Sequence, residues 1–575
     1  MRYSVLAGLI LLLLWLPLSA QYNERQILYQ QANQLYSQRQ YSEAETLFLQ
    51  LLEKYPDDLN SILQLMQIYL SLSQMEKADA LLSKYHRSIP PNTYTELRLQ
   101  LLIARGNLDI AAREAEAYLQ LMNHDINKYR LIASYFERKA FFDYSLDLYQ
   151  RARAWYKDPS LLGLEIANAA MQGRNLPVAV TEYMAYLKSN PGMSPFVKNQ
   201  LKSIVLEDSS MVDLISSIAR NNDSAVLREL YASTLVSLKD YESALEIYKS
   251  LTSNYMIDFA AEQNRLGNDL IAMEAYRYLG DTSPNLTQKF NFKMDLARLY
   301  YRQAQYDSTK AIVNSIIQDP YWNQNPQLSK SRLNMELRKL MAEASLANRD
   351  DISVARSWLE EAKYHSSQTA DIQEVELDLA KLHILSGSYN NAISSLSRVT
   401  LPNLVEKRDY LKFLSAFVQH EIALADSLMN EFVIKYPGSD YVNDAIYLIM
   451  LSLGMQPDDQ KRFAKSVTLL QLRNPAGIDS LYSIFEHNQD EELLLLAIEW
   501  SIGLGEYAKA SLFLTHDFTD DLASDYAQLL KLAFMNDRRD EQNLAREFLK
   551  TNPNSIFSPS FRQVISRIGL SRPNL

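Results

Sequence analysis

Residues 40–48, QYSEAETLF, set the pattern that decides the fold. The aromatic Tyr41 is followed three positions later by the small Ala44, and four positions after that by the apolar Phe48. The small residue then recurs every 33 or 34 positions, at Ala78, Ala111, Ser145 and Ala179. Apolar residues three and four apart mark one buried face of a helix, and a period of this length predicts a repeated helix–turn–helix unit. A single pair of helices cannot cover its apolar face, so we expect neighbouring pairs to stack.

Four stretches carry this pattern most clearly and resemble the tetratricopeptide repeat (TPR) family: residues 40–44 (QYSEA), 240–244 (DYESA), 387–392 (GSYNNA) and 505–510 (GEYAKA). In that family the aromatic residue packs in the turn between the two helices, and the small residue lets the helices approach closely. The resemblance covers nearly the whole chain after residue 20. It implies an all-α fold in which TPR-like helix-turn-helix repeats stack into a superhelical solenoid.

The spacing of the repeats predicts five segments along the chain. They are a signal peptide, a regular TPR array, a degenerate helical pair, a second TPR array, and irregular C-terminal repeats with a capping helix, at residues 1–20, 21–192, 193–223, 224–437 and 438–575. Longer spacings in the second array imply insertions, as at residues 319–326. The capping helix presents a polar outer face, which stops further stacking, through Arg562, Gln563, Ser566 and Arg567.

The first 20 residues have the layout of a secretory signal peptide. Arg2 precedes an apolar run at residues 5–16, and the small residues Ser19 and Ala20 form a cleavage site before Gln21. The apolar run is shorter than the roughly 20 residues that a membrane-spanning helix needs, although a retained anchor stays the alternative. No other stretch approaches spanning length. We therefore expect a mature chain without a transmembrane segment, exported and either periplasmic or associated with the outer membrane.

Residues 432–448, FVIKYPGSDYVNDAIYL, add a second pointer to the same compartment. This stretch is similar to the repeat junctions of periplasmic TPR proteins in outer-membrane assembly and Tol–Pal systems. The resemblance is short, and it implies only that the chain works in the cell envelope.

The composition excludes several classes of function. A chain without cysteine has no disulfide, no thiolate metal ligand, no thiol nucleophile and no acylated lipoprotein anchor. The net charge of −11 disfavours a nucleic-acid partner, which would require a basic surface. The seven histidines form no HExxH motif, and no glycine-rich phosphate loop is present. The sequence therefore predicts no catalytic residue, no cofactor and no metal site.

One enzyme class is nevertheless compatible with the repeats. Soluble lytic transglycosylases carry a periplasmic helical superhelix with an appended lysozyme-like domain, which needs a glutamic acid held as a general acid in an apolar pocket. The nearest candidate is Glu499, but it falls in the first helix of a predicted repeat. The alternative to a scaffold is thus an envelope enzyme, or a carbohydrate-binding accessory protein, built on a helical-repeat superhelix.

The first helix of each repeat is expected to line an inner groove that binds protein or peptide partners. In the register that the resemblance implies, the groove residues are Tyr29, Asn33, Tyr36, Gln67, Asn291, Met294, Arg298 and Tyr301. Aromatic rings and amides suit peptide binding, because they provide contact area and hydrogen bonds at low entropic cost. The two-carboxylate clamp that chaperone adaptors of the family use is absent, since Asn33 alone matches its pattern.

Overall fold

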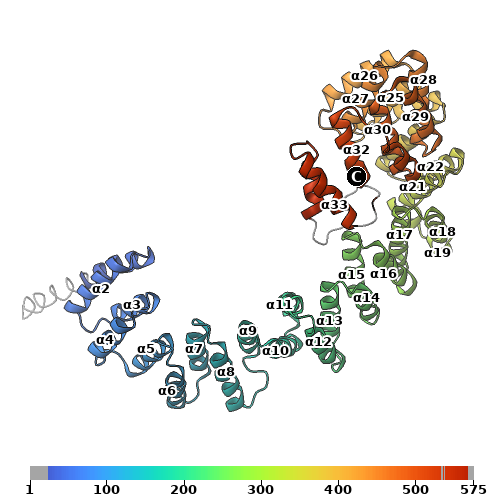
Figure 1. Ribbon diagram of the computed structural model, residues 1–575. Helices are drawn as coiled ribbons and strands as arrows, with labels where there is room; N and C mark the ends of the chain where they lie inside the picture. Colours follow the sequence, from blue (N-terminus) through green and yellow to red (C-terminus); the bar gives the residue numbers. More distant parts are fainter. Residues whose placement is uncertain (1–23, 533–534, 536–537, 567–575) are drawn as a thin grey trace, which may run out of the picture. The chain divides into compact units, whose positions relative to one another are not determined.

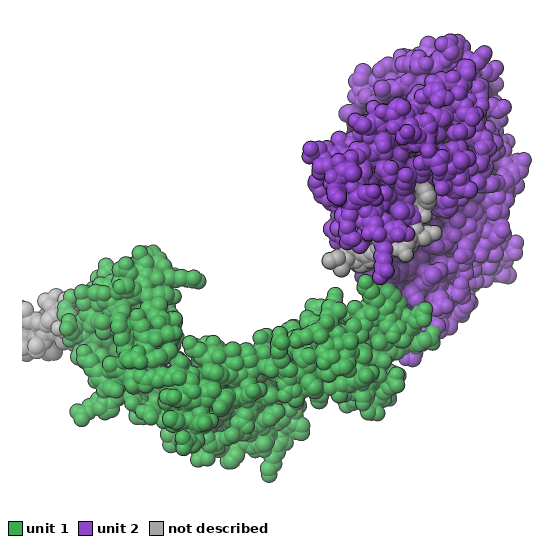
Figure 2. Space-filling view, viewed as in Figure 1, with its two compact units in different colours: residues 1–247 green, residues 248–575 purple. Residues whose placement is uncertain are grey.

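The computed structural model describes residues 24–532, 535 and 538–566, and every regular element within these ranges is a helix. This confirms the predicted all-α fold of stacked helical pairs (Figure 1). The predicted signal peptide lies outside the described residues, as does Arg567 of the predicted capping helix. The chain divides into two compact units, residues 1–247 and 248–575 (Figure 2).

Unit 1 begins with a pair formed by the helical residues 24–37 and α2 (Tyr41–Lys54). The helices that follow are α3 (Leu59–Ser71), α4 (Met75–Tyr85), α5 (Pro91–Ala104), α6 (Leu108–Leu121), α7 (Ile126–Glu137), α8 (Phe142–Tyr156), α9 (Gly163–Gln172), α10 (Leu176–Ser189), the 3₁₀ turn η1 (Pro191–Met193), α11 (Ser194–Glu207), α12 (Met211–Arg220), α13 (Ala225–Ser237) and α14 (Tyr241–Lys249). The segment predicted as a degenerate pair is occupied by α11 and α12.

The periodic small residues lie in the interior of the stack, as the sequence predicts. The relative exposure is 0% for Ala44, Ala78, Ala111, Ser145, Ala179 and Ala244. The aromatic residue of the motif packs across the turn: the ring of Tyr41 lies 5.7 Å from that of Tyr36, and in unit 2 Tyr306 lies 5.6 Å from Tyr301. A larger side chain at the small position would push the paired helices apart.

Five successive turns of unit 1 share a backbone feature that the sequence did not predict. One residue in each turn has a φ between +56° and +78°, at Arg39, Ser73, Gly106, Ala140 and Arg174. Glycine alone adopts this left-handed conformation without steric cost, so four of these five turns are mildly strained. The spacing of 33 or 34 residues shows that the turns, like the small residues, follow the repeat.

Unit 2 contains the remaining helices. They are α15 (Ser253–Arg265), α16 (Asp269–Thr282), α17 (Leu286–Arg302), α18 (Tyr306–Ile317), α19 (Pro320–Gln324), α20 (Pro326–Ser329), α21 (Arg332–Ala347), α22 (Ile352–His365), α23 (Thr369–Leu385), α24 (Tyr389–Ser397), α25 (Val405–Val418), α26 (Ile422–Lys435), α27 (Tyr441–Leu453), α28 (Pro457–Gln471), α29 (Ala476–Asn488), α30 (Glu491–Gly503), α31 (Tyr507–Phe513), α32 (Asp521–Leu532), α33 (Arg538–Thr551) and α34 (Ser558–Ser566).

The insertion predicted at residues 319–326 is helical rather than a loop. Its two short helices, α19 and α20, bury Trp322 completely, and the indole Nε1 donates a hydrogen bond to Asn334 Oδ1 at 3.1 Å. The ring of Trp322 also meets Phe290 edge to face at 5.1 Å. The insertion is therefore part of the core of unit 2.

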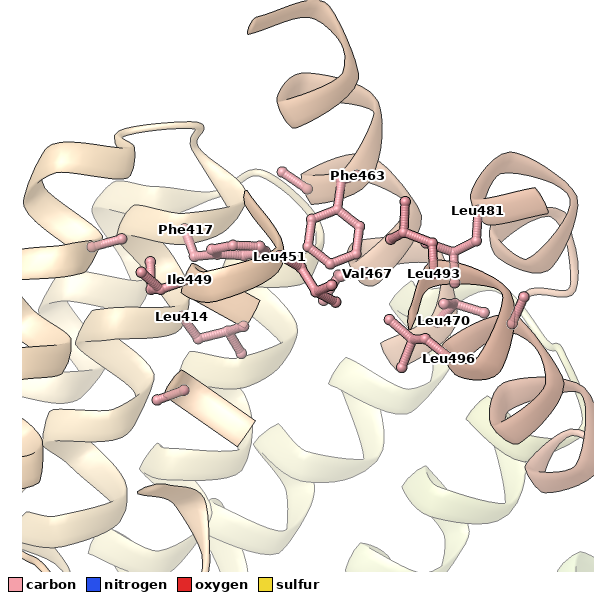
Figure 3. Close-up of a cluster of buried hydrophobic side chains, with 14 of the residues drawn as sticks. Leu414, Phe417, Ile449, Leu451, Phe463, Val467, Leu470, Leu481, Leu493 and Leu496 are labelled. Carbon is pink, nitrogen blue, oxygen red and sulfur yellow. The ribbon is translucent and has the colours of Figure 1, made fainter. Parts of the chain in front are cut away.

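One apolar cluster extends from α23 to α32, and Figure 3 shows part of it. The labelled side chains come from α25, α27, α28, α29 and α30: Leu414, Phe417, Ile449, Leu451, Phe463, Val467, Leu470, Leu481, Leu493 and Leu496. Within it α28 packs mainly against α29 rather than α27. The single helix α27 thus interrupts the succession of pairs, and the interior remains continuous across the interruption.

Ion pairs join neighbouring repeats. The cation and the carboxylate lie about one repeat apart in the sequence and 2.7–2.9 Å apart in space in Lys77–Glu45, Lys128–Glu96, Arg130–Glu165 and Lys407–Asp378. Pairs that are partly exposed to solvent contribute about 0–1 kcal/mol each. Their larger effect is on which repeat faces which.

Candidate functional site

In unit 1, the first helices of three successive repeats surround a cavity of about 260 Å³. Its lining comes from α3, α5 and the C-terminal end of α7: Gln67, Leu70, Ser71, Gln100, Ala104, Tyr135, Arg138 and Lys139. Gln67 Nε2 donates a hydrogen bond to Gln100 Oε1 at 3.3 Å, so amides from neighbouring repeats align along the cavity. Amides that align in this way can donate to and accept from an extended peptide backbone.

The other residues predicted for the groove of unit 1 lie in the first repeat. The ring of Tyr29 lies 5.8 Å from that of Phe48, and Tyr36 contacts Tyr41, so both tyrosines are partly buried by packing within the repeat. Asn33 is exposed. Of these three residues, Asn33 has the side chain most available to a partner.

In unit 2, three of the four predicted groove residues line one cavity of about 290 Å³. Met294, Arg298 and Tyr301 of α17 face Glu336, Lys339, Leu340 and Glu343 of α21 across it. Met294 is only 2% exposed and belongs to the core, while Arg298 pairs with Glu336 at 2.5 Å. Asn291 is exposed and is not part of this lining.

A second cavity, of about 400 Å³, shares Lys339 and Glu343 with the first and was not predicted from the sequence. It is lined by Lys339, Ala342, Glu343, Leu346, Leu359, Asp378, Lys381, Leu382, Leu385, Lys407, Tyr410, Leu411, Leu414, Tyr441, Asp444 and Gln471. On α21, α23 and α25 these residues recur at helical spacing, three or four apart. That spacing was the available signal, but it does not reveal which helices meet.

Most of the charges in this cavity are compensated. The Nζ atom of Lys339 lies 2.6 Å from Glu374 and 2.9 Å from Asp378, and Lys407 lies 2.9 Å from Asp378. Burial opposes the ionisation of Asp378, but the two lysines outweigh it and hold the pKa of its carboxyl below the usual value.

Two of the lining residues differ from this pattern. Within the described residues, neither Glu343 nor Lys381 takes part in a hydrogen bond or an ion pair. Burial raises the pKa of Glu343, and the nearby Asp378 raises it further. Burial likewise lowers the pKa of Lys381, with a smaller contribution from Lys407. Both shifts disfavour the charged forms, as expected for ionisable groups without a partner.

The enzyme alternative depends on Glu499 of α30. Its side chain is partly buried and accepts a hydrogen bond from the Tyr526 hydroxyl at 2.5 Å. Burial raises the pKa of Glu499, and the hydrogen bond from Tyr526 partly offsets this rise. No metal adds to this chemistry in the part of the chain that the structure describes, where no group of three or more His, Asp or Glu could hold an ion.

Helix composition also bears on the setting of the protein. Among the helices of the described ranges, none combines the length and the apolar character that crossing a bilayer requires. The apolar run at the start of the chain lies outside those ranges.

Comparison with known proteins identifies the first repeat. Residues 26–58 match the Tetratricopeptide repeat model. No curated protein matches the sequence. Among solved structures, the complex of Naa15/Naa10 with HypK-THB is 12% identical with a TM-score of 0.23 and covers 95% of this chain and 86% of that chain.

Two further solved structures align over similar lengths. The APC/C hetero-tetramer Cut9-Hcn1 is 14% identical, with a TM-score of 0.25, and covers 93% of this chain and 95% of that chain. The pentatricopeptide repeat protein PPR10 with an 18-nt psaJ RNA is 12% identical, with a TM-score of 0.32, and covers 94% and 84%. These superpositions are too poor to say what the present chain binds. The matched repeat at residues 26–58, with the stacked helical pairs that follow it, makes this chain a TPR-type helical-repeat protein.

Proposed function

We propose that the chain is a non-enzymatic scaffold that binds protein partners in the cell envelope, after export and removal of residues 1–20. The observation that carries the proposal is the cavity of unit 1, in which the amides of Gln67 and Gln100 align on successive first helices. Apolar side chains and Tyr135 surround these amides. This combination favours an extended peptide, since backbone groups and side chains can both be accommodated.

Affinity capture from an envelope fraction tests the proposal. Gln67→Ala combined with Gln100→Ala should reduce the recovery of bound proteins at least tenfold, because partners would lose hydrogen bonds in a desolvated groove. The matched control is Gln50→Ala with Gln120→Ala, which removes two exposed amides from the second helices α2 and α6. Equal recovery with both double variants would refute binding in this groove.

The envelope location needs a separate test. Cell fractionation should place the mature chain outside the cytoplasm, and N-terminal sequencing should begin at Gln21. A chain that retains Met1 and remains in the cytoplasm would refute export without affecting the test of the groove. Association with outer-membrane assembly or with Tol–Pal components belongs to the same proposal, and the partners recovered by capture would decide it.

A glycan-cleaving activity is the second candidate, favoured by the raised pKa that burial gives Glu499. A peptidoglycan zymogram tests it directly. Clearing by the wild-type chain that Glu499→Gln abolishes would establish the enzyme and overturn the scaffold as the whole function. Absence of clearing by both chains removes this candidate.

A further inference from the structure

The 400 Å³ cavity of unit 2 has the size and lining of a small-molecule site. Pockets for small ligands commonly measure about 300–1,000 Å³ and combine apolar walls with a few polar groups. Here one wall is formed by Leu382, Leu411 and Leu414, and the polar groups come from α21, α23, α25, α27 and α28. A single compact ligand fits this space better than a folded domain does.

The unpaired charges define the chemistry of the ligand. Lys339, Lys407, Glu374 and Asp378 compensate one another, which leaves Lys381 and Glu343 without partners among the described residues. Ionisable groups that are withdrawn from water cost free energy unless a partner replaces the lost hydration. The cavity therefore lacks one carboxylate and one ammonium group.

The two unpaired groups belong to neighbouring first helices and act on each other electrostatically. The third uncompensated group, Asp444, acts on Tyr410 instead and shows no such effect from Lys381 or Glu343. A ligand that satisfies both must carry opposite charges close together at one end. The interior of a peptide carries neither charge, and each end of a peptide carries only one.

We propose that this cavity binds a free α-amino acid with an apolar side chain. Its carboxylate lies against the Lys381 ammonium, and its ammonium lies against the Glu343 carboxylate. The apolar side chain packs against Leu382, Leu411 and Leu414. The proposal adds a small-molecule site to the scaffold and does not depend on partner binding in unit 1.

Isothermal titration of the full chain with leucine, methionine and phenylalanine tests the proposal. At least one of them should bind, and two analogues of it separate the charges. The N-acetyl derivative lacks the ammonium and resembles a peptide C-terminus, while the amide lacks the carboxylate and resembles a peptide N-terminus. Each analogue should bind at least tenfold more weakly than the parent amino acid.

Two variants assign the charges to residues. Lys381→Met should weaken the amino acid at least tenfold and leave the amide unaffected, and Glu343→Gln should do the same with the N-acetyl derivative unaffected. Lys202→Met and Glu53→Gln make the same chemical changes at exposed positions of unit 1 and should leave binding unchanged. Thermal melting of each variant checks that it is folded.

Three results would overturn the proposal. One is the absence of binding by all three amino acids at millimolar concentration. Another is an analogue that binds as tightly as the amino acid, which would show that the cavity recognises a peptide end. The third is unchanged affinity in folded Lys381→Met and Glu343→Gln variants. None of these results bears on capture by the groove of unit 1.

Discussion

The guanidinium of Arg349 lies 2.8 Å from the carboxylate of Glu506, although 157 residues separate the two in the sequence. Arg349 lies in the turn after α21, with φ at +62°, and Glu506 directly precedes α31. Gln471 of α28 lines the same cavity as the residues of α21, so a second contact relates these distant parts of unit 2. The stack in unit 2 therefore returns on itself, which bounds the cavity from more than one side.

The Arg349–Glu506 pair should make a small, salt-dependent contribution to stability. Both side chains are partly exposed, so a double-mutant cycle with Arg349→Ala and Glu506→Ala is expected to give a coupling of about 0.2–1 kcal/mol. The coupling should vanish in 1 M salt, where charges are screened within about 3 Å. A coupling that persists in high salt would contradict an electrostatic contact.

The small position of the repeat should not accept a large side chain. Ala244 has no exposed surface, and Ala244→Phe is expected to cost on the order of 1–3 kcal/mol through overpacking of α13 and α14. Ala117→Phe, at an exposed position of α6, serves as the control and should change stability by less than about 0.5 kcal/mol. Equal melting temperatures of the two variants would refute the placement of Ala244 at the helix crossing.

A strained turn offers the opposite effect. Ala304 is exposed and has a φ of +56°, so Ala304→Gly should remove a steric cost and stabilise the protein by about 0.5–1 kcal/mol. Ala297→Gly, in the interior of α17, should instead destabilise it by about 1 kcal/mol. Urea denaturation measures both changes, and a loss of stability in Ala304→Gly would contradict the left-handed turn.

Glu499 should make stability depend on pH. Because its pKa is raised in the folded state, the folded chain holds this proton more tightly, and the resulting stabilisation is lost as pH rises through the folded pKa. Glu499→Gln should therefore melt at a higher temperature than wild type at neutral pH, and the difference should shrink in acid. Glu53→Gln, at an exposed position, should show no such trend. A difference that is constant across pH would rule out the burial effect.

The fold could be predicted because its signal is local and repeated. Ala44, Ala78 and Ala111 are close to identical in spacing and surroundings, so one helical pair implies the next. The left-handed turns could not be predicted, because Arg39 and Ser73 are not residues that favour this conformation. The insertion around Trp322 was placed correctly but its helices were not, since their packing depends on Phe290 and Asn334 in other repeats.

The candidate sites could be predicted only in part. Gln67, Arg298 and Tyr301 line cavities, because the family register fixes which face of a first helix is free. The same register does not distinguish Met294, which the core absorbs. Glu343 and Lys381 were missed, since their isolation becomes visible only once the ion pairs of the surrounding helices are known. Partner binding by the eight predicted groove residues remains a prediction.

The ion pairs between neighbouring repeats also limit how the chain could change in length. Loss of one whole repeat would preserve the apolar contacts, because every pair offers a similar interior face. It would also separate partners such as Lys128 and Glu96 and place each beside a residue selected for a different neighbour. The repeats are therefore not interchangeable modules, and duplication or deletion of one would require matching charge changes at the new junction.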